Sequence, residues 1–169
     1  YGNYLKNSIP VVTCNKIACA SDFENYLQLK RLARKFSAPF LFETNVGAGL
    51  PIIDTLKNLI LSGDKVNKIQ AVLSGSLNFI FNNFTEGTSF NEVVAEAMHE
   101  GYTEPDPKID LTGLDVMRKI LILARESGYK MELSEIENRA FLPENALKAD
   151  TPVAFLKVLK QENQHFVNL

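Results

Sequence analysis

Two spacings of apolar residues run along this chain, and together they predict an ordered series of strands and helices. Short apolar runs at 10–14, 39–42 and 68–73 are typical of strands. Apolar residues three and four apart predict helices over 21–37, 51–63, 76–84, 89–101 and 110–128, a short element at 134–142 and a helix near 152–160. Strands alternating with helices predict an α+β or α/β fold with a mixed β-sheet.

Several helix starts carry a capping signal. The spacing S-x-x-E occurs at 21–24 and again at 89–92, which predicts two capping boxes. Asp110 precedes an apolar run and is the expected N-cap of the helix that follows. The segment 74–76 could hold an anionic group on free backbone N–H groups, or Ser76 could simply act as an N-cap.

Composition limits the classes of function. The 169 residues are 46% hydrophobic and 22% charged, with a net charge of −2, which indicates a globular domain and no basic surface for nucleic acid or an anionic membrane. No apolar run reaches the length of a membrane span, and nothing at the start resembles a signal peptide, so we expect a cytoplasmic protein. The two cysteines and two histidines make a poor zinc site.

The segment 101–119 carries the strongest chemical signal. Glu104, Asp106, Asp110 and Asp115 lie within twelve residues, and carboxylates at this density repel one another unless donors or cations lie among them. Asp115 and Lys119 are four residues apart on a predicted helix, so they share one face. Such a pair could transfer a proton or polarise a hydroxyl oxygen. The alternative is a surface pair worth about 0.3–0.5 kcal/mol.

Two further segments could bind small charged groups. Lys16 follows an apolar strand, where ligands of open α/β sheets bind, although a solvated loop lysine has the same pattern. Glu43 ends a strand and meets the glycine-bearing turn 45–49. One carboxylate with several backbone carbonyls suits a weakly held cation, whereas the alternative is a glutamate that caps the next helix. Both readings of each segment stay open at this level.

These segments together resemble the homoserine dehydrogenase family. The resemblance rests on four motifs in the family's order and spacing: T-C-N-K at 13–16, E-T-N-V-G-A-G-L-P-I at 43–52, L-S-G-S-L-N-F-I-F at 73–81, and G-Y-T-E-P-D-P-K-I-D-L-T-G-L-D-V-M-R-K at 101–119. It is closest to the dehydrogenase half of bifunctional aspartokinase/homoserine dehydrogenases. The resemblance implies interconversion of L-homoserine and L-aspartate 4-semialdehyde with NADP(H) or NAD(H), a homodimer, and fusion to an aspartate kinase.

The resemblance also implies a role for individual residues. Glu104 and Asp110 would bind the homoserine amino group, with Tyr102 and Ser76 nearby. The hydroxyl or aldehyde oxygen would be handled by Asp115 and Lys119, with Lys16 contacting both substrate and cofactor and Asn15 at the cofactor. A monovalent cation, Na⁺ or K⁺, would be held by Glu43 and the carbonyls of Val46, Ala48 and Leu50. We expect the acidic segment and the two lysines to converge on one small polar ligand.

The chain departs from the family pattern in two places. Ile109 stands where an aspartate is common, which lowers the local charge. No dinucleotide-binding glycine motif is present, so residues 1–16 are expected to be the end of a nucleotide domain and 17–169 a truncated substrate-binding and dimerisation domain. Such a fragment would be inactive alone. Two other functions remain possible: divalent-metal phosphoryl transfer on the acidic cluster, or a non-catalytic dimerisation domain with an apolar patch around 79–84.

Overall fold

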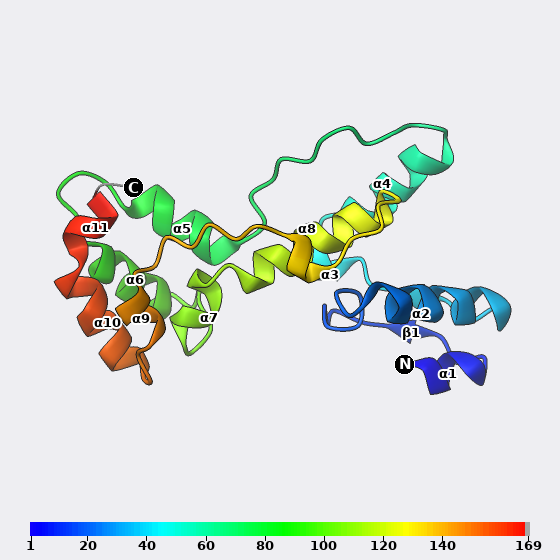
Figure 1. Ribbon diagram of the computed structural model, residues 1–169, viewed down its shortest axis with the longest axis horizontal. Coiled ribbons are helices and arrows are strands. Elements are labelled where there is room, and N and C mark those ends of the chain that lie inside the picture. Colours follow the sequence, from blue (N-terminus) through cyan, green and yellow to red (C-terminus); the bar gives the residue numbers. More distant parts are fainter. Residues whose placement is uncertain (168–169) are drawn as a thin grey trace. The chain divides into compact units, whose positions relative to one another are not determined.

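The computed structural model describes residues 1–167, so the last two positions of the expected 17–169 domain lie outside the described residues. Its elements, in chain order, are α1 (Gly2–Lys6), β1 (Val11–Val12), α2 (Phe23–Lys35), β2 (Phe40–Leu41), α3 (Thr44–Gly47), α4 (Ile52–Leu61), α5 (Gly75–Asn83), α6 (Phe90–His99), α7 (Pro107–Leu111), α8 (Leu114–Glu126), the 3₁₀ helix η1 (Leu133–Glu135), α9 (Glu144–Leu147), α10 (Pro152–Gln161) and α11 (Asn163–Val167) (Figure 1). Within 1–167, none of the helices combines the length and apolar character needed to cross a membrane.

The chain divides into two compact units. The first unit comprises Tyr1–Leu73 and Met117–Glu137, and the second comprises Ser74–Val116 and Asn138–Leu169. The long helix α8 begins in the second unit and continues in the first. Each unit has its own apolar core, because the two clusters of buried side chains share no member.

In the first unit, β1 and β2 pair in parallel, with Val11 opposite Phe40 and Val12 opposite Leu41. Helix α2 connects the two strands and packs against α1 and β2. This strand–helix–strand arrangement is the connection that parallel strands require. The predicted α+β class is confirmed. Within the described residues the sheet has two parallel strands and is smaller than the mixed sheet that we expected.

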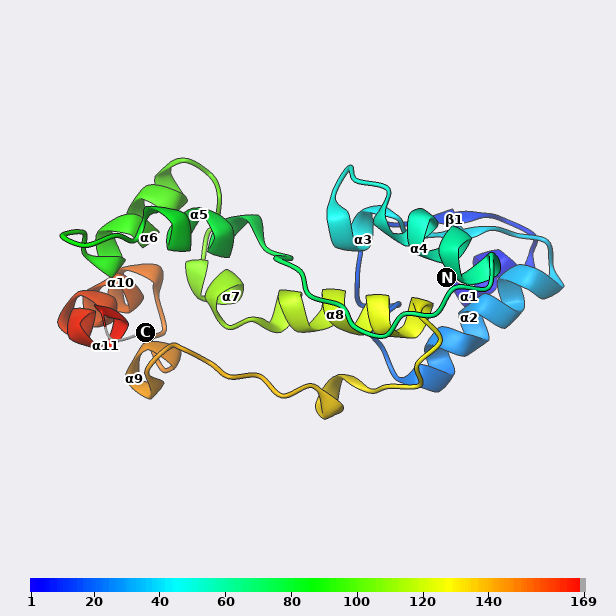
Figure 2. The same ribbon diagram turned by 90° about the horizontal axis from the view of Figure 1, so that it is seen from above.

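The strand predicted at 68–73 is wrong. Residues 64–74 have no regular secondary structure and form the long extended connection between α4 and α5 (Figure 2). Val72 is 77% exposed. A strand exists only where a neighbouring strand accepts and donates backbone hydrogen bonds, and no strand of residues 1–167 pairs with this segment. The apolar pattern specifies faces of a strand but cannot supply that partner.

The second unit is helical and is built around aromatic side chains. Helix α6 packs against α5, α10 and α11. Phe90, on α6, stacks on Phe166 with ring centroids 4.1 Å apart, and both side chains are buried. Phe155 and Leu159 of α10 complete this core. Helix α10 confirms the helix predicted near 152–160.

Neither predicted capping box forms, because distant side chains cap these helices instead. Asn163 Oδ1 accepts a hydrogen bond from the Phe90 N–H at 2.8 Å at the start of α6, and no cap is formed by the Ser89 hydroxyl. At the start of α2, the Glu132 carboxylate accepts from the Phe23 N–H at 2.9 Å. Local spacing cannot reveal a cap that arrives from another element.

The helix predicted at 110–128 is in fact two helices. Asp106 N-caps α7 by accepting from the Lys108 N–H at 3.1 Å, and Pro107 occupies the first turn, where its missing N–H costs nothing. The prediction of Asp110 as an N-cap is therefore wrong, since Asp110 lies inside α7. Gly113, with φ +78°, separates α7 from α8. Ser76 is likewise not a cap, because the Ser74 hydroxyl accepts from the Leu77 N–H.

We expect Gly113→Ala to destabilise the second unit by about 1–2 kcal/mol, since a left-handed backbone is costly for a residue with a Cβ. The new Cβ would also meet Asn138 Oδ1 at 3.3 Å, and Asn138 donates to the Thr112 carbonyl. Urea unfolding of the variant measures the loss. Gly75→Ala is the matched control in the same unit, because a Cβ at that position would have no neighbouring atom within 4 Å. Equal midpoints for the two variants would contradict this account.

Candidate functional site

Four of the predicted substrate residues lie together in the second unit. The Ser76 hydroxyl oxygen is 2.6 Å from the Tyr102 carbonyl oxygen and 2.8 Å from Asp110 Oδ1. The Glu104 N–H donates to Asp110 Oδ2 at 2.8 Å. Asp110 thus uses both carboxylate oxygens to join α5 to the segment 102–104. The sequence placed these residues in two separate motifs, and the fold brings the motifs into direct contact.

The ends of three helices position this cluster. Ser76 is in the first turn of α5, which Ser74 caps. Tyr102 follows the end of α6, where its N–H donates to the Ala97 carbonyl at 2.8 Å. Asp110 is in α7, whose start is fixed by Asp106 and Pro107. The Tyr102 ring stacks on Phe79, with centroids 4.1 Å apart and planes 20° apart, so the aromatic residue is held on α5 as well.

The cluster has the chemistry of a site for a cationic group. The Ser76 hydroxyl has one proton and two acceptors within reach, so it can donate to only one of them at a time. Asp110 is partly buried and Glu104 has an exposed side chain. The Asp110 carboxylate accepts from the backbone N–H of Glu104, and the Glu104 side chain adds a second carboxylate, so the two residues provide negative charge and acceptor oxygens for an ammonium group.

The predicted catalytic pair lies on α8. Asp115 and Lys119 are one helical turn apart, and both side chains are partly buried rather than fully exposed. Lys119 Nζ donates to the Leu73 carbonyl at 2.7 Å within the first unit. Leu73 opens the 73–81 motif, so this contact fixes the lysine next to the start of a second predicted functional segment.

The loop after β1 carries Lys16 and Asn15. Asn15 Oδ1 accepts from the Ile17 N–H at 2.8 Å, which forms an Asx turn around Lys16. Asn45, which is fully buried, reaches this loop from α3. With its amide nitrogen turned toward the loop, Asn45 donates to the Cys14 carbonyl at 2.9 Å and the Thr13 carbonyl at 3.1 Å. Asn45 therefore couples the T-C-N-K loop to the turn after Glu43, a role the sequence analysis missed.

Glu43 caps α4. Its two carboxylate oxygens accept from the Ile53 N–H at 2.7 Å and the Asp54 N–H at 2.8 Å. This is the capping alternative that the sequence left open, and it is compatible with a cation, since each carboxylate oxygen has a further lone pair. Ala48, with φ +50°, turns the chain between α3 and Leu50. One carboxylate and the carbonyls of this turn are hard oxygen donors, so the donor set fits a monovalent cation.

A buried ionic cluster in the first unit was not predicted. The Glu126 side chain is 1% exposed and accepts a hydrogen bond from the Tyr26 hydroxyl. Lys30 Nζ donates to both Glu126 oxygens, at 2.8 and 2.9 Å, and Lys57 Nζ lies 3.7 Å away. Burial, followed by the charge of Glu126, raises the pKa of Tyr26. The only signal in the sequence was a glutamate on the apolar face of a helix.

Arg125, the residue before Glu126, is completely buried as well. Its guanidinium donates to the carbonyls of Cys19 at 2.8 Å and Ser21 at 2.6 Å, and its Nε donates to the Met131 carbonyl at 3.0 Å. Glu132 Oε2 accepts from Nη2 at 3.0 Å. Burial lowers the pKa of Arg125, and the Glu132 carboxylate opposes that shift.

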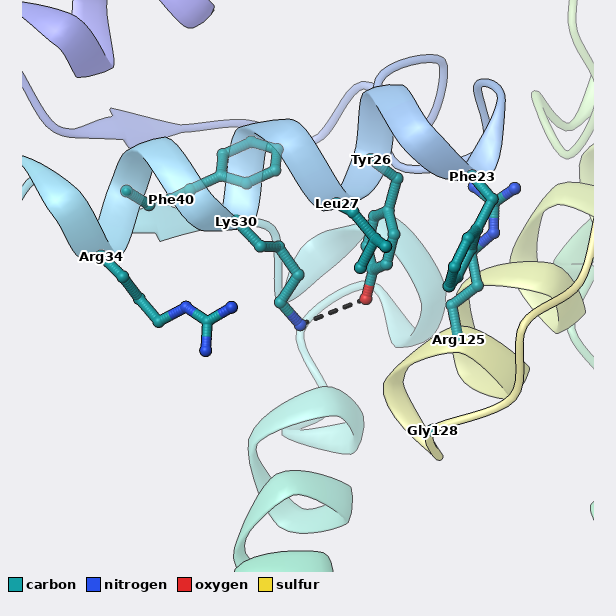
Figure 3. A pocket seen from close by; sticks show the side chains of 9 residues that line it. Phe23, Tyr26, Leu27, Lys30, Arg34, Phe40, Arg125 and Gly128 are labelled. Carbon is teal, nitrogen blue, oxygen red and sulfur yellow. Dashed lines mark hydrogen bonds between the residues drawn. The ribbon is translucent and has the colours of Figure 1, made fainter.

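A pocket of about 470 Å³ opens beside this cluster (Figure 3). It is lined by Phe23, Tyr26, Leu27, Lys30, Ala33, Arg34, Phe40, Arg125 and Gly128. Although three of these side chains are cationic, Lys30 is already bonded to Glu126 and Tyr26, and Arg125 to three carbonyls and Glu132. The pocket therefore has less positive charge to offer an anion than its composition suggests.

Comparison with known proteins decides the family. A family model described as homoserine dehydrogenase matches residues 51–166, which include the Ser76, Glu104 and Asp110 cluster and both residues of the α8 pair. The chain belongs to the homoserine dehydrogenase family. The resemblance found in the sequence motifs is confirmed.

Among relatives in this family, the chain is 50% identical over 151 residues to a chloroplastic bifunctional aspartokinase/homoserine dehydrogenase 1 of Zea mays, covering 89% of this chain and 16% of the maize protein. A crystal structure of a Candida auris protein of unknown function is 35% identical, with a TM-score of 0.91, over 99% of this chain and 49% of that one. A hyperthermophilic archaeal homoserine dehydrogenase in complex with NADPH is 33% identical, with a TM-score of 0.67, over 82% of this chain and 44% of that one. The chain thus spans only part of each homoserine dehydrogenase relative.

We expect the two cysteines to differ sharply toward alkylating reagents. Burial, together with the charge of Glu126, raises the pKa of the Cys19 thiol to about 12, whereas Cys14 is exposed. Because the thiolate is the reactive form, Cys19 should stay unmodified at mildly alkaline pH until the protein unfolds. Mass spectrometry after timed iodoacetamide treatment measures this, with Cys14→Ser as the control. Rapid labelling of Cys19 in the folded protein would contradict the burial described here.

Proposed function

We propose that the full-length protein interconverts L-homoserine and L-aspartate 4-semialdehyde with NADP(H) or NAD(H). The observation that carries the proposal is the direct contact of Ser76, Tyr102, Glu104 and Asp110 in a chain of the homoserine dehydrogenase family. NADPH is named with the archaeal relative, which supports NADP(H) as the cofactor. The chain spans 16% of the maize bifunctional relative, and the activity is proposed for the protein as a whole.

In this proposal the acidic cluster binds the amino end of the substrate. The α-ammonium of homoserine would donate to the carboxylates of Glu104 and Asp110, and charge-assisted hydrogen bonds of this kind are the strong ones. Ser76 would keep Asp110 oriented, since its hydroxyl is within hydrogen-bonding distance of Oδ1. Tyr102 would contribute its ring, which is held flat against Phe79.

The proposed chemistry takes place at the other end of the substrate. NADP(H), when bound, supplies or accepts the hydride at the carbon that changes oxidation state. In the reducing direction Lys119 would give a proton to the carbonyl oxygen, and in the oxidising direction it would remove the hydroxyl proton. Asp115, one turn away on the same helix, would support Lys119 in this role. Lys16 would add positive charge at the same oxygen, which lowers the cost of the charge that develops there.

The remaining ligand roles rest on the first unit. Asn15 and Lys16 would meet the cofactor, and the Asx turn between them supports this placement by ordering the loop. A monovalent cation, Na⁺ or K⁺, would be held by Glu43 and the carbonyls of Val46, Ala48 and Leu50. The compatibility of the Glu43 cap with a further ligand supports this cation site.

The wider organisation is also part of the proposal. Residues 1–16 would end a nucleotide domain and 17–169 would form the substrate-binding and dimerisation domain, inactive without the remainder of the protein. Fusion to an aspartate kinase is supported by the bifunctional relatives. The homodimer and the cytoplasmic location are inferences from the family resemblance and from the sequence, respectively.

The two alternative functions have less support. Divalent-metal phosphoryl transfer would need several carboxylates that share one ion. Within residues 1–167, no group of three or more His, Cys, Asp or Glu side chains is placed to hold a metal ion. A non-catalytic dimerisation domain would not require the contact between the 73–81 and 101–119 motifs. Family membership and that contact both favour the dehydrogenase.

We expect Glu104→Gln in the full-length protein to raise the KM for homoserine by about tenfold or more, because a charge-assisted hydrogen bond is worth roughly 1.5–3 kcal/mol. The KM for NADP⁺ should change little. Steady-state rates of NADPH formation measure both constants. Glu96→Gln removes a charge that is also exposed, on α6, and serves as the control. A parallel rise of both KM values would refute an ammonium-binding role.

We expect Lys119→Met to lower kcat by about a hundredfold or more, since loss of a general acid–base group typically costs 10²–10⁴. The KM for homoserine should change much less, because the amino-binding carboxylates remain. Lys65→Met, at an exposed lysine within the extended connection, is the matched control. A kcat within a few fold of the wild-type value would remove Lys119 from the proton transfer.

A further inference from the structure

One side chain joins the helix of Lys119 to the loop of Lys16. Arg125 lies six residues after Lys119 on α8, and its Nη1 donates to the carbonyls of Cys19 and Ser21. Both acceptors belong to the loop that follows Lys16. The Lys16 carbonyl accepts from the Ala20 N–H at 2.8 Å, so the loop that Arg125 binds is hydrogen-bonded to Lys16 itself.

The geometry of this contact suits a positioning role. A guanidinium carries five N–H donors in a fixed plane, so it sets the directions of its acceptors as well as their distances. Arg125 is completely buried and bonds to acceptors on both sides of α2 in the sequence: Cys19 and Ser21 before it, Met131 and Glu132 far after it. Glu132 in turn caps α2 through the Phe23 N–H. The loop therefore has one defined place relative to α8.

Arg125 does not hold α8 in the unit alone, because its neighbour contributes as well. Glu126 bonds to Tyr26 and Lys30 of α2 and lies within ion-pair distance of Lys57 of α4. The two adjacent residues thus have different contacts. Glu126 connects α8 to α2 and α4, and Arg125 connects α8 to the loop after Lys16. A change at Arg125 should disturb the loop more than the fold.

We propose that Arg125 is a positioning residue for the reaction, which sets the place of Lys16 relative to α8 and so relative to Lys119. The inference rests on the proposed function, since it concerns the two lysines assigned to the reacting oxygen. In this role Arg125 would act through the Cys19 and Ser21 carbonyls and would not itself contact substrate or cofactor.

The test is Arg125→Lys in the full-length protein, which keeps the charge and loses the planar fork. We expect kcat to fall about tenfold or more, because small misplacements of reacting groups are costly. The KM for homoserine should stay within about threefold of the wild-type value, since the carboxylates proposed to bind its amino group are unchanged. Arg31→Lys is the control, because Arg31 is exposed and its ion pair with Glu24, at 3.9 Å, lies on the surface. A wild-type kcat in Arg125→Lys would overturn the proposal.

A double-mutant cycle separates positioning from general damage. If Arg125 acts through Lys16, Arg125→Lys should lower kcat little further once Lys16→Met is present. If the double variant instead lowers kcat by the product of the two single effects, Arg125 acts independently of Lys16, and the proposal is overturned. If Arg125→Lys does not yield folded protein, Glu132→Gln replaces it in the same cycle. Its side chain is 42% exposed, and the same lack of additivity is expected.

Hydrogen exchange provides a readout that needs no activity. In Arg125→Lys, the amides of 16–21 should exchange about tenfold faster or more, while those of α4 change little. Unchanged exchange in the loop would overturn the proposal even if kcat fell. If instead the wild-type protein shows no homoserine-dependent NADP⁺ reduction, the proposed function fails. The exchange data would still decide whether Arg125 orders the loop.

Discussion

Two opposite charges, Arg125 and Glu126, are buried side by side at the end of α8, and the arrangement of the first unit depends on them. An ion taken out of water is costly unless its hydrogen-bonding capacity is met. Glu126 is satisfied only if α2 and α4 bring Tyr26, Lys30 and Lys57 to it. Arg125 is satisfied only if the loop after Lys16 and the segment 131–132 supply their acceptors. Two neighbouring side chains therefore constrain four separate segments.

The second unit reaches its functional geometry by a different route. Its core is apolar and aromatic, and it fixes the helices so that their ends meet where Ser76, Tyr102 and Asp110 lie. Polar contacts at the surface of that core then join the ends. Asp106 and Pro107 start α7 early enough for Asp110 to fall inside the helix, with its carboxylate turned to the Glu104 N–H. A substrate-binding cluster on rigid helix ends is well suited to holding a small charged ligand.

Much of this could be predicted from the chain alone. The longer helices α2, α4, α5, α6, α8 and α10 followed from apolar spacing, whereas the short helices α1, α3, α7, α9 and α11 were not predicted. The family followed from the resemblance of four motifs. The grouping of Ser76 with Asp110 was expected only through the family resemblance, and the structure brings them within hydrogen-bonding distance. Asn45, by contrast, was overlooked although it stands within a motif, because nothing in a sequence shows that an amide two residues after Glu43 will be buried under the Lys16 loop.

Local spacing was sufficient to predict the longer helices, and the resemblance of four motifs predicted the family and the residue types available for binding a small amino acid. Which polar groups satisfy one another depended instead on the folded chain. Asn163 and Glu132 cap helices far from them in sequence. The 68–73 segment does not form a strand, because no strand of residues 1–167 pairs with it. The hydrogen bonds of Arg125 to the loop after Lys16 likewise join segments that are far apart in the sequence. Hydrogen bonds between distant segments are fixed by packing, and packing is a property of the folded chain as a whole.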